Sequence, residues 1–268
     1  FGAAQLFRKA GWSQLGCDYG SSRLSRMTND LAMLEANQIP SVNRQEMIED
    51  YIADVVAHEA GHCMGLRHNF IASTNLTCAE LGDADLVKSQ GTAASVMDYI
   101  DLNIIAVLKK KGVFVNSTIG AYDVHAIRYG YADIPAATPE GELFALNQIA
   151  KEGGRRGLEF MTDEDADGFD PRVVRFDGAR DPINYAAATI QVAKNTMNYA
   201  IRELPKPGES YARRNGLILN SVAMIFGQAN RCARFIGGLN ASRTFKGDVG
   251  ERPNLAPVDP NLQRQALQ

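Results

Sequence analysis

The chain has 268 residues and a formal net charge of −3; 45% of its residues are hydrophobic and 22% are charged. This composition is ordinary for a globular protein with one large domain or two small ones, and the charge gives no indication of nucleic-acid binding. No apolar stretch approaches the roughly 18 residues that a membrane-spanning helix needs.

The first 40 residues are predicted to be mostly helical. Within residues 22–36, apolar side chains recur at helical spacing, at Leu24, Met27, Leu31 and Leu34. The chain opens on Phe1, with neither an initiator methionine nor a signal peptide. We therefore expect a fragment, or the mature part, of a longer protein.

A long helix is predicted from about Arg44 to Met64. Asn43 and Glu46 form an N-x-x-E capping pattern at its start. Apolar residues then follow at helical spacing, at Met47, Ile48, Tyr51, Ile52, Val55 and Val56. We expect this stripe to anchor the site at the end of the helix rigidly.

The end of this helix carries the most informative pattern in the chain, H-E-x-x-H-x-x-G-x-x-H, and three of the four histidines lie in it. Residues four apart share one helix face, so His58 and His62 can direct their imidazoles at one zinc ion. Gly65 permits a left-handed turn that ends the helix, which lets His68 return as a third ligand. Glu59, beside the first ligand, can act as general base on a metal-activated water. Three protein ligands leave a position open for catalysis, whereas structural zinc sites are usually closed by four.

Residues 69–135 are predicted to be mixed. The segment 69–95 reads as loop, 101–111 as a helix that ends in a basic run before Gly112, and 113–115 as a short strand. A further helix is predicted over residues 119–131. His125 lies in that helix, and we interpret it as a surface or packing residue because the ligand count is already complete.

A domain boundary is predicted at about 132–142, where Pro135, Pro139 and Gly141 cluster. It divides the chain into a zinc-binding region, 1–135, and a helical region, 136–268. The second region contains predicted helices at about 142–151, 184–203 and 211–235, and a tail from Gly247 that reads as extended. The predicted fold class is mainly α, with little strand.

An acidic loop follows the boundary. Asp163, Asp165 and Asp167, followed by Gly168, match the beginning of a calcium-binding loop. The twelfth position is Val174 rather than Glu, so the full pattern is not met. A calcium site and a solvated acidic loop are both open, and we favour the loop.

The four cysteines are Cys17, Cys63, Cys78 and Cys232, and they include no C-x-x-C pair. They could form two disulfides or remain thiols, and the sequence does not decide between these. Cys63 lies between two predicted ligands, but the helix turns its side chain away from the face that His58 and His62 share. We expect Cys63 to pack in the core.

The histidine run resembles the metzincin clan of metallopeptidases. The clan has a methionine-containing turn beneath the metal, and Ser95-Val96-Met97-Asp98-Tyr99 is similar to it. The segment 121–130 is similar to the helix that closes metzincin catalytic domains. The closest resemblance is to a bacterial group of large, exported zinc-dependent metzincins. It is carried by residues 58–70, 95–99, 122–131, 162–166 and Asp181-Pro182, and so spans about residues 45–185.

This resemblance has several implications. Met97 would form the floor under the ligands, and Tyr99 would bind zinc or stabilise the oxyanion, as in astacin-like and serralysin-like members. The protein would be secreted, periplasmic or on the cell surface. Metzincins normally place a substrate-binding sheet before the zinc helix, whereas the roughly 43 residues before it here read as helical. We therefore expect that sheet to be missing from this fragment.

Two hypotheses account for these patterns. The favoured one is a zinc metalloendopeptidase acting on peptides or proteins, with His58, His62 and His68 as ligands and Glu59 as base. The alternative is a zinc-stabilised helical binding or scaffold domain with little peptidase activity. The substrate preference and the oligomeric state are not evident from the sequence.

Overall fold

The computed structural model describes residues 17–39 and 43–268. The predicted fold class, mainly α, is confirmed, since two short strands are the only ones among these residues. The longer helices are α2 (Tyr19–Ala36), α3 (Arg44–Cys63), α7 (Ala121–Tyr131), α8 (Pro139–Ala150), α9 (Pro182–Glu203) and α10 (Ala212–Ala233). The shorter ones are η1 (Ala72–Asn75), α4 (Cys78–Leu81), α5 (Ala84–Gln90), α6 (Ile104–Lys109), η2 (Lys151–Gly154) and α11 (Pro260–Gln265).

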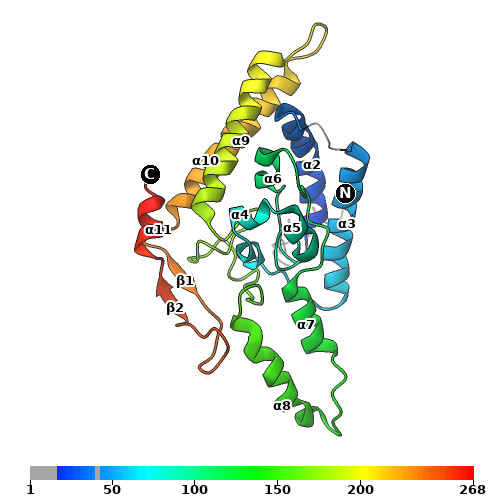
Figure 1. Cartoon of the computed structure of the whole chain (residues 1–268), viewed down its shortest axis with the longest axis vertical. Coiled ribbons are helices and arrows are strands. Elements are labelled where there is room, and N and C mark those ends of the chain that lie inside the picture. The colour runs from blue at the N-terminus through cyan, green and yellow to red at the C-terminus, as the bar shows by residue number, and fades with distance from the viewer. Residues whose placement is uncertain (1–16, 40–42) are drawn as a thin grey trace, which may run out of the picture.

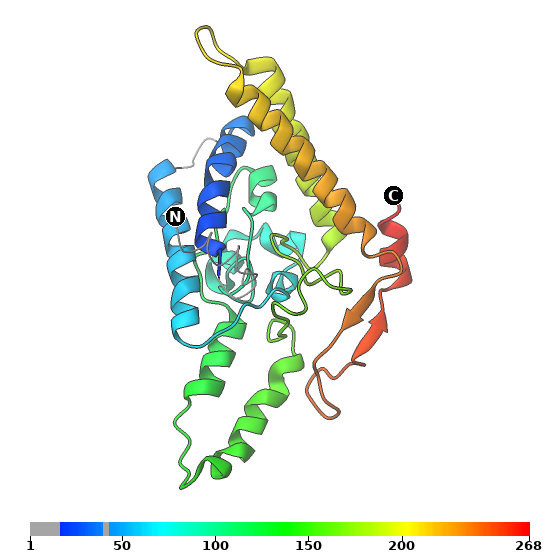
Figure 2. The ribbon, with the colours of Figure 1, turned by 180° about the vertical axis from the view of Figure 1, so that it is seen from behind.

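The molecule is elongated. The α9–α10 pair projects at one end and the α7 and α8 helices project at the other, with α2, α3 and the short helices between them (Figure 1). The same arrangement is seen from behind (Figure 2). The strands β1 (Leu239–Ala241) and β2 (Leu255–Pro257) form an antiparallel pair that lies beside α11.

Helices α2 and α3 are joined by a buried charged contact. Arg23 on α2 and Asp54 on α3 form an ion pair of 2.9 Å, and Tyr19 donates a 2.7 Å hydrogen bond to the same carboxylate. Tyr51 contributes its ring face to the Arg23 guanidinium, 4.4 Å from the ring centroid. Because each charge has a partner, α2 can pack closely along the zinc-motif helix.

The main hydrophobic core draws on both halves of the chain. Met33 and Leu34 of α2 and Met47 of α3 share one cluster of buried residues with Tyr185 and Val192 of α9. The predicted boundary near residue 135 stays a prediction. Because the core is shared, α9 supports both α2 and α3, and α3 carries the first two histidines of the run.

Most predicted helices are found, with small shifts at their ends. Helix α3 begins and ends within one residue of the prediction, and Asn43 caps it by accepting a 3.0 Å hydrogen bond from the Gln45 N–H. Helix α8 begins earlier than predicted because Pro139 fits the first helical turn. The part of the N-terminal helical prediction that falls on residues 1–16 lies outside the described residues.

Four predictions are wrong in part. The segment 69–95 contains η1, α4 and α5, which are too short to show a helical period. Residues 113–115 form no strand, because the Phe114 carbonyl accepts from Asn103 rather than from a neighbouring strand. The tail predicted to be extended is extended at β2 but ends in the helix α11, which Asp259 caps. The apolar stripe of α3 is narrower than predicted, since Ile52 and Val56 are exposed.

No helix in the described part of the chain is long and apolar enough to cross a membrane.

Candidate metal centre

The histidine run begins on the last two turns of α3, and the turn after it is built by glycine. Gly65 has a φ of +84°, which is a left-handed conformation. Its N–H donates to the His62 carbonyl and the Leu66 N–H donates to the Gly61 carbonyl, each at 3.0 Å. This pair of bonds is a Schellman motif, which ends a helix and reverses the chain. Gly65 therefore stands at the point where the helix ends and the chain turns back.

The three imidazoles of the run converge. The rings of His58 and His62 and those of His62 and His68 have centroids 4.8 Å apart, and those of His58 and His68 are 5.3 Å apart. The Nε2 atoms of His62 and His68 are only 3.2 Å apart. His58 is fully buried, and His68 is 8% exposed. The helix and the turn together bring the three side chains to one point.

Each ring is held from behind by an oxygen atom. The Nδ1 atoms of His58, His62 and His68 lie 2.7 Å from the Val96 carbonyl, 2.9 Å from the Leu66 carbonyl and 2.7 Å from the Asp163 carboxylate. Carbonyl and carboxylate oxygens only accept hydrogen bonds, so each Nδ1 carries the proton and donates it. Each Nε2 is then left with a free lone pair facing the other two, which is the arrangement that metal-ligating histidines need.

The protonation of the histidines fits a cation at this point. Burial lowers the pKa of His58 to about 3. Burial also lowers the pKa of His68, although the hydrogen bond to Asp163 opposes the shift. Two lone pairs 3.2 Å apart repel each other unless a cation lies between them. Imidazole is a ligand that zinc prefers, so the donor set fits that metal.

The segment predicted to form the methionine turn lies directly against α3. Met97 is fully buried, and a Cβ atom placed on Gly61 would overlap its sulfur. The absence of a side chain at Gly61 is thus what allows this close approach. Met97 packs beneath the two turns of helix that carry His58 and His62.

Asp123 anchors the same turn. Its carboxylate accepts hydrogen bonds from the Ser95 hydroxyl at 2.5 Å, the Val96 N–H at 2.9 Å and the Gly120 N–H at 2.8 Å. Asp123 stands in the first turn of α7, so α7 holds the turn whose Val96 carbonyl orients His58. The sequence showed the α7 motif but not this role.

Tyr99 lies beside the imidazoles with its hydroxyl engaged. Its ring centroid is 5.0 Å from that of His68 and 5.5 Å from that of His58. The Tyr99 hydroxyl donates to the Asp18 carboxylate at 3.1 Å and accepts from the Asp18 N–H at 3.2 Å. Burial raises the pKa of Tyr99, so the phenol is neutral at physiological pH. Glu59 is exposed on the adjoining face of α3.

Cys17 is the member of the cluster that the sequence did not reveal. One donor atom from each of Cys17, His58, His62 and His68 lies within 4.8 Å of all the others. The sulfur is 3.3 Å from His58 Nε2, although 41 positions separate the two residues. Burial raises the pKa of the Cys17 thiol, so it is protonated at neutral pH in the absence of a metal. A cysteine without a neighbouring ligand motif gives no sequence signal for such a contact.

The other cysteines correct one prediction. Over residues 17–39 and 43–268, which include all four cysteines, each thiol is free. Cys63 is exposed and does not pack in the core. It is the last residue of α3, and Met64, which follows it, is also exposed.

The acidic loop gives no support for calcium. Asp163 is bound to His68, and Asp165 accepts from the Thr162 N–H at 2.8 Å and pairs with Arg243 at 2.7 Å. Asp167 lies 3.6 Å and 3.9 Å from two arginine side chains, Arg175 and Arg234. The three carboxylates therefore have separate partners and do not face one another around a cation.

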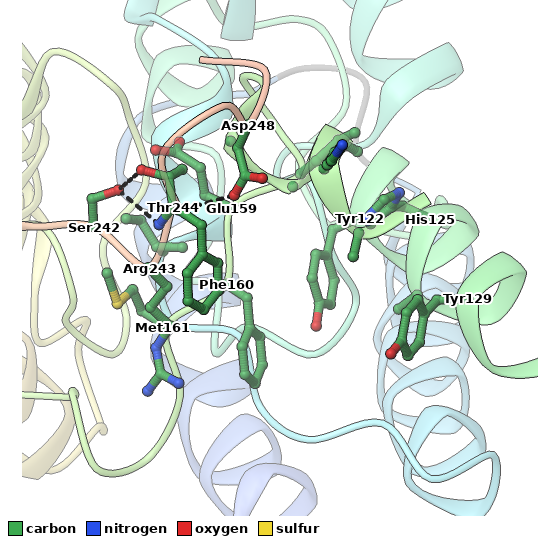
Figure 3. A pocket seen from close by; sticks show the side chains of 18 of the residues that line it. Tyr122, His125, Tyr129, Glu159, Phe160, Met161, Ser242, Arg243, Thr244 and Asp248 are labelled. Atoms are coloured by element: carbon green, nitrogen blue, oxygen red, sulfur yellow. Dashed lines mark hydrogen bonds between the residues drawn. The ribbon is translucent and has the colours of Figure 1, made fainter. Parts of the chain in front are cut away.

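A cavity of about 880 Å³ opens beside the metal centre, lined at one edge by residues 64–67. Figure 3 shows its two walls, with Tyr122, His125 and Tyr129 on α7 at one side and Ser242, Arg243 and Thr244 at the other. Phe160 stacks on Tyr122 between them, with ring centroids 5.7 Å apart. His125 is half-buried in this wall and lies apart from the three converging histidines. This position agrees with its interpretation as a surface or packing residue.

A family model described as Met-zincin matches residues 40–268. No curated protein and no solved structure matches the chain.

Proposed function

The chain belongs to the Met-zincin family, and from this membership we propose that it is a zinc metallopeptidase in which His58, His62 and His68 hold the metal. The observation that carries the proposal is that the three Nε2 atoms converge on one point. In each ring, the other nitrogen, Nδ1, is held by a hydrogen bond to an oxygen atom. Because the family is one of peptidases, we propose peptides or proteins as the substrates. The resemblance to exported metzincins leads us to propose that the protein acts outside the cytoplasm.

The catalytic roles follow from the positions of the side chains. Zinc, when bound, would supply Lewis-acid polarisation of the scissile carbonyl and activation of a water molecule. Glu59, one residue after His58, would accept the proton of the attacking water and deliver it to the leaving amine. The neutral Tyr99 phenol would donate a hydrogen bond to the developing oxyanion once it leaves Asp18. Met97 and Asp123 would hold the floor of the site.

The test is the substitution Glu59→Gln, which keeps the shape of the side chain and removes its basicity. We expect zinc content to be unchanged and peptide hydrolysis to fall by about 100-fold or more, because general-base catalysis contributes that much. Glu49→Gln, at an exposed position on the same helix, is the matched control and should change neither. Each substitution is made twice, once in the wild-type chain and once in the Cys17→Ser variant, because the Cys17 thiol contacts Glu59. Hydrolysis is measured by digestion of a peptide library. Hydrolysis by Glu59→Gln at the control rate would refute the mechanism.

One observation favours a second function, a zinc-stabilised binding or scaffold domain: Cys17 offers a fourth donor atom beside the three histidines. Structural zinc sites usually have four protein ligands, and Cys17 with the three histidines makes four. A zinc-stabilised binding or scaffold domain would use this set without needing Glu59. Zinc binding without cleavage of any library peptide, in the wild-type chain and in Cys17→Ser, would favour this function.

A further inference from the structure

The position of Cys17 relative to the histidines carries an inference about regulation. We propose that the Cys17 thiolate fills the fourth position around zinc, so that this chain holds the metal in a closed Cys–His₃ site and is latent as a peptidase. The proposal rests on the zinc site proposed above. In this state the chain would keep its catalytic residues, but the fourth position around the metal would be filled.

The separations of the donor atoms match a tetrahedral site. With zinc–nitrogen bonds of about 2.0–2.1 Å and a zinc–sulfur bond of about 2.3 Å, two nitrogens lie about 3.3 Å apart, and a nitrogen and a sulfur about 3.6 Å apart. The observed separations are 3.2 Å for His62 Nε2 to His68 Nε2 and 3.3 Å for Cys17 Sγ to His58 Nε2. All pairs of donor atoms lie within 4.8 Å of each other, so the widest pair needs to close by about 1.5 Å at most to reach the tetrahedral separation.

The sulfur also stands where catalysis would need open space. Cys17 Sγ is 3.6 Å from a Glu59 carboxylate oxygen and 3.5 Å from the Tyr99 hydroxyl. It therefore lies among the histidines, the proposed base and the proposed oxyanion donor. A water molecule placed for attack would have to contact the same groups. One sulfur atom thus excludes the nucleophile and separates the two side chains that would act on it.

The thiol is held in place by the two residues that follow it in the chain. The next residue, Asp18, exchanges two hydrogen bonds with the Tyr99 hydroxyl. Tyr19 is fully buried, and its ring centroid lies 4.4 Å from that of His58. Because α2 begins at Tyr19 and is tied to α3 through Asp54, the contact of Cys17 belongs to a packed helix start.

The chemistry of closure and release requires no redox step. On closure the thiol gives its proton to solvent, and a sulfur–zinc bond forms in place of a bond to water. Release reverses both changes. An alkylating agent such as iodoacetamide makes release permanent, because a sulfur–carbon bond forms, iodide leaves, and the thioether sulfur carries no charge.

The experiment uses the full chain loaded with cobalt in place of zinc, because a thiolate ligand to cobalt produces a charge-transfer absorption band in the near ultraviolet. Wild type and Cys63→Ser should show the band, and Cys17→Ser should lack it. Cys63 is the matched control because it lies in the histidine run but is exposed. A band that persists in Cys17→Ser, or that is missing from the wild type, would overturn the closed site.

A second measurement needs no variant and so does not depend on how Cys17→Ser folds. Wild-type protein is treated with iodoacetamide with and without zinc, and the alkylated cysteines are identified by mass spectrometry. Cys17 should be protected by zinc, whereas Cys63 should react in both samples. Equal alkylation of Cys17 in the two samples would contradict coordination by the thiolate.

Peptidase activity separates the failure of this proposal from the failure of the proposed function. Cys17→Ser should cleave peptides faster than the wild type by about tenfold or more, because only the dissociated fraction of the wild type is competent. Equal rates would overturn latency and leave the peptidase in place. A thiolate band in the wild type, with no cleavage by Cys17→Ser, would support closure and overturn the proposed function.

Discussion

The histidine run 58–68 and the acidic loop 163–170 both place metal-binding side chains at close sequence spacing, yet only the first brings its donor atoms together. Two of its histidines stand one turn apart on α3, and a Schellman turn at Gly65 fixes where the third returns. In the acidic loop, Asp165 and Asp167 instead pair with arginines.

The two regions differ in what orients the side chains, because a metal ligand needs a second contact that holds it toward the metal. In the histidine run, every Nδ1 has an oxygen acceptor, so the rings cannot turn away from the common point. In the loop, the arginines satisfy the carboxylates one by one. Asp163 belongs to both regions, because its carboxylate orients His68. The acidic loop therefore contributes to the metal centre indirectly, through the hydrogen bond between Asp163 and His68.

The largest effect is expected from removing a ligand. His62→Ala should reduce zinc content well below about one ion per chain, because two imidazoles and the Cys17 thiolate leave the proposed site one ligand short. His125→Ala, at the histidine in the wall of the cavity, is the control and should keep full zinc content. Metal analysis of the purified, dialysed proteins gives the answer, and zinc retained equally by both variants would contradict the assignment.

The next effect tests the link between the two regions. Asp163→Asn should weaken zinc binding by roughly 10–100-fold, since partners of ligating histidines commonly contribute that much. Glu164→Gln is the matched control, because Glu164 pairs with Arg67 at the surface and does not contact a histidine. Competition with a zinc chelator measures both affinities. Equal affinities would mean that Asp163 does not act through His68.

A smaller effect concerns the burial of His58. Its pKa is lowered from 6.5 to about 3 by burial, so the unfolded chain binds one more proton than the folded chain between those values. Stability of the zinc-free protein should be full above about pH 6.5 and should fall on acidification by up to about 1.4 kcal/mol per pH unit. Urea denaturation between pH 7 and 4 should show a shallower dependence for His58→Asn than for the wild type. Parallel curves would argue against this origin.

The smallest effect is expected from calcium. Millimolar calcium should leave the melting temperature of the zinc-loaded protein unchanged within about 1 °C, because a ligand that does not bind gives no stabilisation. Asp165→Asn should respond in the same way, apart from the loss of a surface ion pair that contributes about 0–1 kcal/mol. A calcium-dependent rise in the wild type that Asp165→Asn abolishes would restore the calcium interpretation.

The parts of the site that could be predicted from the sequence are those encoded by local spacing. The helix over residues 44–63, the turn at Gly65 and the convergence of His58 and His62 all follow from helical geometry. The strand at 113–115 was predicted wrongly because a strand depends on a partner far along the chain, and none pairs with it here.

The parts that could not be predicted depend on contacts between distant residues. Cys17 reaches the histidines through the packing of α2 on α3, and Asp163 reaches His68 across 95 positions. Asp123 anchors the turn at residues 95–99 by accepting hydrogen bonds from the Ser95 hydroxyl and the Val96 N–H, and no spacing rule in the sequence indicates such contacts. A single sequence shows the residue types but not these pairings.

The contact between Gly61 and Met97 limits how far this metal centre could be transplanted. The two variable positions inside H-E-x-x-H are not equivalent, because Ala60 is exposed whereas a Cβ atom at Gly61 would meet a buried sulfur. A designer who grafts the eleven residues onto another helix without a matching floor would obtain ligands at the right spacing but no support beneath them. The portable unit is therefore the helix together with the turn at residues 95–99, not the histidine run alone.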